Sequence, residues 1–136
     1  MKRWITLLLC ATLVLFYTSC GNKQEPLAPS YDEIVAAYEA EGYEVWCKEI
    51  TDGSYGIVYQ IQASDSDGDY INFYFFDTVE DAKEYEETVQ FNGLVWIFTV
   101  IYGDPTWGTV QRYGTVVIEY EYQNRYLYKP FQELTA

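Results

Sequence analysis

The 136 residues, 49% of them hydrophobic, suffice for one domain with a hydrophobic core and are too few for two. The formal net charge of −13 disfavours nucleic acid as a partner, because affinity for a phosphate backbone comes largely from basic side chains. The sequence contains no histidine, which excludes Ser-His and Cys-His catalytic pairs. We therefore expect neither an enzyme nor a bound cofactor.

The N-terminus has the layout of a bacterial export signal. Lys2 and Arg3 precede an uncharged apolar stretch that runs from Trp4 to Tyr17. An uncleaved membrane anchor is one alternative, but the stretch is shorter than the roughly 20 residues of a spanning helix. A plain secretory signal is another, but its A-x-A cleavage pattern is missing. A signal peptide at 1–19 leaves six basic and 21 acidic residues in the mature chain, a net charge of 6 − 21, or −15.

The residues "YTSC" at 17–20, followed by "GN", resemble the lipobox of bacterial lipoproteins. In these proteins the signal is cut before a cysteine that carries a diacylglycerol thioether. The resemblance implies that Cys20 is lipidated and that a lipid anchor holds the chain at the membrane, outside the cytoplasm, in the cell envelope. Residues 20–29 are polar and contain proline, so we predict a flexible tether there and a single folded domain at 30–136. We expect Cys47 to be a small core residue without a disulfide.

The elements of the domain follow from the period of its apolar residues. A capping box from Ser30 to Glu33 begins a helix, and Gly42 ends it. Helices are expected at 30–42 and 77–90, and strands at 43–50, 56–63, 70–77, 93–102 and 114–122. The tail from Gln123 to Ala136 fits either a last strand or a short helix. This order, α-β-β-β-α-β-β, predicts an α+β two-layer sandwich in which two helices pack on one face of an antiparallel sheet of about five strands.

The middle of the chain, "ASDSDGDYINFYFFDTVEDAKEYEE" at 63–87, is similar to small uncharacterised bacterial lipoproteins and secreted proteins. The resemblance carries no assigned activity. Within it, Asp65, Asp67 and Asp69 alternate and could present oxygen ligands to Ca²⁺. Their spacing does not fit an EF-hand loop, and we favour the interpretation of a solvated hairpin turn over a calcium site.

Aromatic residues are the other candidate contact groups, since the chain has 15 tyrosines and 4 tryptophans. Trp107 lies beside Asp104 in the turn-rich segment "GDPTWG", and Tyr120 and Tyr122 lie in the last predicted strand. Tyrosine and tryptophan suit protein interfaces and sugar stacking alike, although such rings also simply fill sheets. We therefore expect a non-catalytic interaction module for an envelope protein partner. The alternative is a lipoprotein that binds a glycan on aromatic platforms or a cation at the 65–69 turn.

Overall fold

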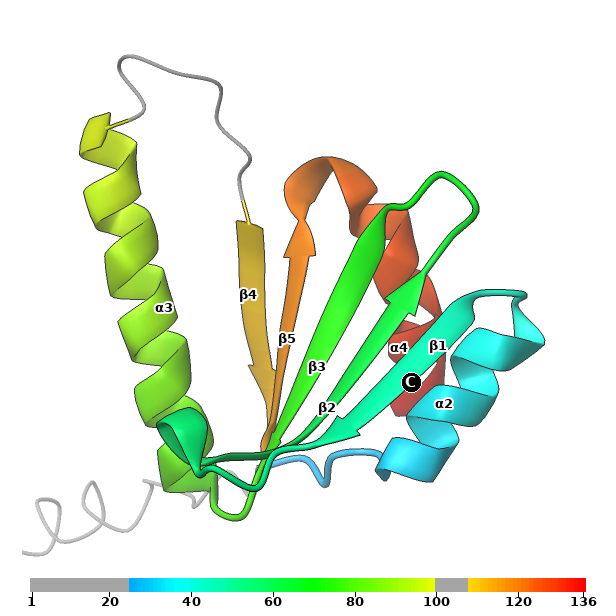
Figure 1. Cartoon of the computed structure of the whole chain (residues 1–136), viewed down its shortest axis with the longest axis horizontal. Coiled ribbons are helices and arrows are strands. Elements are labelled where there is room, and N and C mark those ends of the chain that lie inside the picture. The colour runs from blue at the N-terminus through cyan, green and yellow to red at the C-terminus, as the bar shows by residue number, and fades with distance from the viewer. Residues whose placement is uncertain (1–24, 100–107) are drawn as a thin grey trace, which may run out of the picture.

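The computed structural model describes residues 25–99 and 108–136, which form a five-stranded sheet and three α-helices. The elements are α2 (Tyr31–Ala40), β1 (Glu44–Glu49), the 3-10 helix η1 (Ser54–Gly56), β2 (Ile57–Ser64), β3 (Tyr70–Phe76), α3 (Val79–Thr99), β4 (Gly108–Tyr113), β5 (Val116–Glu121), the 3-10 helix η3 (Tyr122–Tyr128) and α4 (Lys129–Thr135) (Figure 1). The predicted α+β class and the antiparallel sheet are confirmed.

The strands lie in the order β1-β2-β3-β5-β4, and every neighbouring pair is antiparallel. Three of the pairs, β1–β2, β2–β3 and β4–β5, join strands that are consecutive in the chain, and α3 separates the third pair from the first two. The last hairpin turns tightly at Gly114, whose φ of +58° favours a residue without a Cβ. The register places alternate residues of each strand on opposite faces, so the two faces of the sheet have different compositions.

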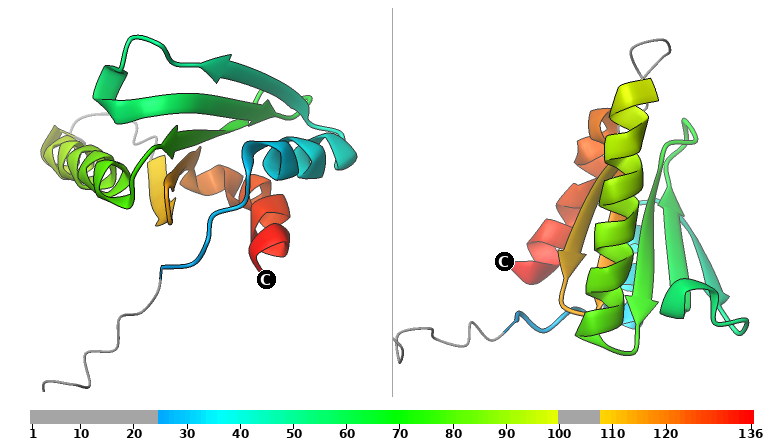
Figure 2. Two further views of the ribbon diagram at one scale, coloured as in Figure 1. Left: turned by 90° about the horizontal axis from the view of Figure 1, so that it is seen from below. Right: turned by 90° about the vertical axis from the view of Figure 1, so that its left-hand side faces the viewer.

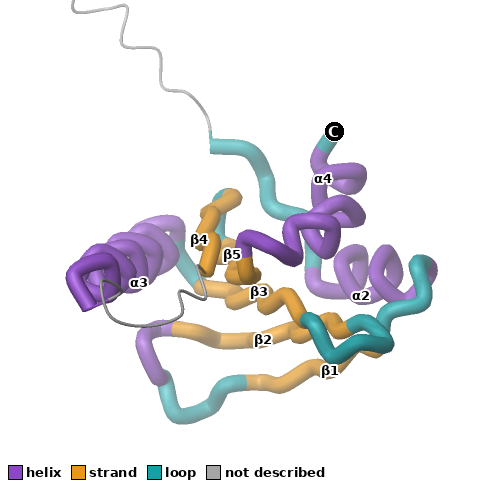
Figure 3. The backbone as a smooth tube through the Cα atoms, turned by 90° about the horizontal axis from the view of Figure 1, so that it is seen from above, coloured by secondary structure: helices purple, strands orange, loops and turns teal. Residues whose placement is uncertain are grey.

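The helices cover both faces of this sheet. Val116 and Ile118 of β5 belong to the buried cluster that includes α2 and α4, whereas Val117 packs with Ala82 of α3. Figures 2 and 3 show α2 and α4 on one side of the sheet and α3 on the other. Two helices thus share a face, but the second of them is the C-terminal α4 and not the helix predicted at 77–90.

The main core lies between the sheet and the pair α2 and α4. Helix α2 begins at the predicted capping box, in which Ser30 and Glu33 each accept from the other's backbone N–H. Its buried side chains are Ile34 and Tyr38. The Tyr38 ring contacts Phe73 of β3 at 5.2 Å between centroids, and its hydroxyl donates to the Leu127 carbonyl at 2.7 Å. One tyrosine therefore joins α2 to the sheet and to η3.

The strand predicted at 93–102 is wrong. Residues 93–99 continue α3, and 100–102 lie outside the described residues. An apolar run of this length fits a strand or a helix equally well, and periodicity alone could not separate them. The fourth strand is Gly108–Tyr113, which pairs with β5 across the Gly114 turn.

The segment predicted as a tether is described from Glu25 onward, and there it contacts the domain. Its Glu25 carboxylate forms a two-point ion pair with Arg112 of β4, which also binds Glu86 of α3 at 3.2 Å. The Pro26 carbonyl lies where a Cβ on Gly114 would be 2.9 Å away. Residues 25–28 thus lie along the β4–β5 turn, a contact that the local sequence pattern did not indicate.

Candidate functional site

A cavity of about 510 Å³ lies where β5 passes into η3, at the edge of the α2 and α4 face. Four elements contribute its walls: β4, β5, η3 and α4. The lining residues are Gln111, Tyr120, Arg125, Tyr126, Tyr128 and Gln132. We call this cavity the Tyr120 pocket. Its walls are three phenol rings, two amides and one guanidinium, with no carboxylate among them.

A stack of aromatic rings forms one wall of the pocket. The rings of Tyr120 and Tyr128 are nearly parallel, 5.4 Å apart at an interplanar angle of 11°, and Phe131 stacks behind Tyr128 at 5.6 Å. Gln111 of β4 donates from Nε2 to the Tyr120 hydroxyl at 3.0 Å. Burial raises the pKa of both Tyr120 and Tyr128, so both hydroxyls stay protonated and neutral at physiological pH.

Among the described residues that line the pocket, Arg125 carries the single charge. Arg125 is exposed and makes no ion pair within residues 25–99 and 108–136. Three other basic residues of the same ranges do make ion pairs: Lys83 with Glu87, Arg112 with Glu25 and Glu86, and Lys129 with Glu133. The cation in the pocket is therefore available to an external group.

The acidic turn forms a support behind Tyr126. The Tyr126 hydroxyl donates to Asp65 Oδ2 at 2.5 Å and lies 3.0 Å from Asp69 Oδ2. Asp65 Oδ1 accepts from the backbone N–H groups of Asp67 and Asp69 at 2.9 and 3.1 Å. The Tyr126 hydroxyl and these N–H groups hold the pKa of Asp65 below its ordinary value. Among the described side chains, no three His, Cys, Asp or Glu groups are arranged to hold a metal ion.

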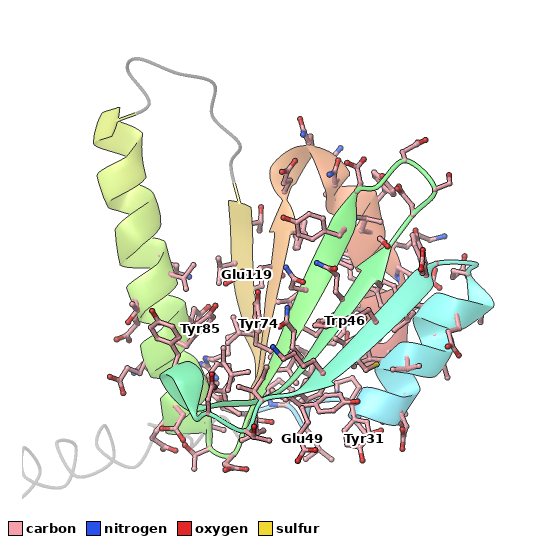
Figure 4. All side chains as sticks on the ribbon, in the orientation of Figure 1. Tyr31, Trp46, Glu49, Tyr74, Tyr85 and Glu119 are labelled. Carbon is pink, nitrogen blue, oxygen red and sulfur yellow. The ribbon has the colours of Figure 1, made fainter. Side chains whose placement is uncertain are left out.

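A second cluster lies on the opposite face of the sheet, between α3 and the strands. Asn72 Oδ1 accepts from Gln62 Nε2 at 3.1 Å, and Asn72 is paired in register with Glu119. The Tyr85 hydroxyl of α3 donates to Glu119 Oε1 at 3.0 Å, and Tyr74 also bonds this carboxyl. Figure 4 shows Tyr74, Tyr85 and Glu119 gathered on this side.

The chemistry of this second cluster is that of a buried carboxyl with internal partners. Burial raises the pKa of Glu119, and the two tyrosine hydroxyls oppose that shift without cancelling it. The carboxyl fastens α3 to β5 through Tyr85. Farther along the same face, Trp46 of β1 is half exposed beside Gln62, its neighbour in register.

The residues predicted from the sequence are only partly placed by the structure. Tyr120 lines the pocket, and Tyr122 begins η3. Cys20, Asp104 and Trp107 lie outside the described residues. Cys47 is exposed, so the prediction of a core cysteine is wrong; β1 is an edge strand with mostly exposed side chains.

Sequence reasoning missed Arg125, both glutamines of the pocket and Glu119. No local motif marks them, because they become neighbours only through strand pairing and the return of the chain after β5.

Within the described ranges, no helix is both long enough and apolar enough to cross a membrane. No family model, no curated protein and no solved structure matches this chain.

Proposed function

We propose that this chain is a lipid-anchored, non-catalytic binding domain outside the cytoplasm, at the bacterial cell envelope, and that the Tyr120 pocket takes a sugar unit of a glycan. The observation that carries the proposal is the pocket itself. Its volume of about 510 Å³ lies in the range of roughly 300–1,000 Å³ that is typical of small-molecule sites. Aromatic walls with a few convergent polar groups suit a ring that is apolar on its faces and hydroxylated at its rim.

The wall chemistry supports a sugar more than a purely apolar ligand. A tyrosine face can contact the C–H groups of a sugar ring, while its hydroxyl donates and accepts hydrogen bonds. The amides of Gln111 and Gln132 add donors and acceptors from two further directions. Because the tyrosine hydroxyls stay neutral, they can serve in either hydrogen-bonding role.

The place where the N-terminal segment joins the domain, at Glu25, also supports a binding role at a membrane. Glu25 contacts Arg112 near the β4–β5 turn, at the lower end of the sheet in Figure 1, whereas η3 lies at the upper end. The six residues of β5 separate these ends by roughly 17 Å, at about 3.4 Å per residue. Glu25, the described residue nearest in sequence to Cys20, thus lies at the end of the sheet opposite the pocket.

The proposal is tested by titrating neutral and acidic oligosaccharides into the full-length chain, purified from membranes in detergent. Gln132→Trp fills the pocket from an exposed position of α4, and Gln90→Trp makes the same change at an exposed position of α3. We expect Gln132→Trp to abolish binding and Gln90→Trp to leave it unchanged. If no oligosaccharide binds, or if both variants bind as the parent does, the pocket is not a glycan site.

The anchor is tested separately by intact mass spectrometry of the membrane fraction. A mature mass that begins at Cys20 and includes lipid, lost in Cys20→Ala, is the expected result. An unlipidated chain, or one that still begins at Met1, would contradict the anchor without affecting the pocket.

A protein partner on the α3 side of the sheet is the second candidate. Trp46 favours it, because 50% of this large apolar residue is exposed on a face with few apolar neighbours. In that case Trp46→Ala would weaken association with the envelope protein and Gln132→Trp would not. A cation at Asp65, Asp67 and Asp69 has less support, since both oxygens of Asp65 are already engaged inside the protein.

A further inference from the structure

We infer that the Tyr120 pocket selects an acidic sugar, a hydroxylated ring whose single carboxylate is bound by Arg125; this inference rests on the proposed glycan site. The first observation is the availability of that guanidinium. Of the five basic residues in the described ranges, Lys83, Arg112 and Lys129 are in ion pairs with acidic side chains. Lys48 is the other one without an ion pair, and it lies on the edge strand β1, outside the pocket lining.

The second observation is the neutrality of everything else in the pocket wall. Two amides and three protonated tyrosines can bond the hydroxyl groups of a sugar, but none of them can balance a charge. Arginine presents a planar fork of N–H donors that matches the two oxygens of a carboxylate. A ring acid held in the pocket would thus meet its one charge partner at Arg125.

The charge of the whole domain limits the ligand to a weakly charged anion. Twenty-one acidic residues face six basic ones after Cys20, so the long-range field opposes the approach of any polyanion. Asp65 and Asp69 also lie directly behind Tyr126, at 2.5 and 3.0 Å from its hydroxyl. A single carboxylate close to Arg125 is opposed least in this field, whereas a phosphate with nearly two charges is opposed more strongly.

The test compares the methyl glycosides of galacturonic, glucuronic and mannuronic acid, each with one carboxylate, with their carboxyl methyl esters, by calorimetric titration of the full-length chain in detergent. Each ester keeps the ring and its hydroxyls and removes only the charge. We expect at least one acid to bind about tenfold more tightly than its ester, because only the acid can form a hydrogen-bonded ion pair with the Arg125 guanidinium. Arg125→Gln should remove this preference, and Arg125→Lys should retain part of it.

Lys83→Gln is the matched control, because it makes the same change in net charge at an exposed site on α3. It should keep the preference for the acid. Equal binding of acid and ester, abolished by Gln132→Trp, would overturn the acidic-sugar inference and leave the glycan site standing. The same inference fails if Arg125→Gln retains the preference for the acid. If none of the acids, esters or neutral sugars binds, both proposals fail.

Discussion

Removing one buried hydroxyl, in Tyr38→Phe, should loosen the wall of the Tyr120 pocket from behind. Tyr38 is fully buried, and its hydroxyl donates to the Leu127 carbonyl at 2.7 Å across 89 residues of sequence. Phenylalanine keeps the ring contacts with Tyr43 and Phe73, at 5.4 and 5.2 Å between centroids. The Leu127 carbonyl loses this donor in the interior, and the Phe131 backbone N–H loses the hydroxyl oxygen that it bonds. An orphaned buried acceptor costs about 1–3 kcal/mol.

The assay is thermal and urea unfolding of the variant and its parent, followed by circular dichroism. For a domain of this size, the loss corresponds to a midpoint lowered by roughly 4 °C or more per kcal/mol. Tyr31→Phe is the control, because Tyr31 lies on the same helix with its ring 48% exposed. It should change the free energy of unfolding by less than about 0.5 kcal/mol. If Tyr38→Phe is no less stable than Tyr31→Phe, the Tyr38 bond does not hold η3.

Two further substitutions test the contact of residues 25–28 with the β4–β5 turn and the raised pKa of the buried Glu119 carboxyl. Gly114→Ala places a Cβ 2.9 Å from the Pro26 carbonyl at a φ of +58°, so it should cost about 1–2 kcal/mol and expose residues 25–28 to proteases. Gly68→Ala, at a φ of +88° in open space, should carry the backbone cost without this exposure. Because burial raises the pKa of Glu119, its favourable contribution to folding is complete below the unfolded pKa and is lost as pH rises through the folded one. Glu119→Gln should therefore flatten the fall in unfolding free energy between acidic and neutral pH; an unchanged slope would contradict that shift.

The α+β class and the first half of the fold were predictable because local signals agreed with the tertiary structure. The capping box at Ser30 begins α2, and the turns at 50–56 and 64–70 separate three strands that are close to the predicted ranges. The second half was not predictable in this way. The apolar residues after Gln90 have no strand period, and a continuous apolar run of this kind fits a helix as well as a strand. In the structure, residues 91–99 continue α3.

The pocket was even less accessible to sequence reasoning. An abundance of tyrosine drew attention to Tyr120, but nothing local links it to Gln111 or Gln132. Gln111 lies on the neighbouring strand β4, and Gln132 lies on α4, which packs with β5 in the main core only because the chain reverses after β5. Arg125 could have been noticed as one of six cations after Cys20. That it forms no ion pair with any residue of 25–99 or 108–136 is a property of the folded structure.

The wall of the pocket formed by η3 is held by two neighbouring residues that bond to different parts of the domain. Tyr126 bonds the β2–β3 turn through Asp65, and Leu127 bonds α2 through Tyr38. A 3-10 helix has poor internal hydrogen bonds, so these two contacts set how rigid the wall is before a ligand arrives. Asp65→Asn converts the oxygen that faces Tyr126 into an amide donor and removes the charge-assisted bond. We expect faster amide exchange at residues 125–128 and weaker sugar binding, although Asp65 itself does not line the pocket. Unchanged exchange at these amides would show that the turn does not hold the wall.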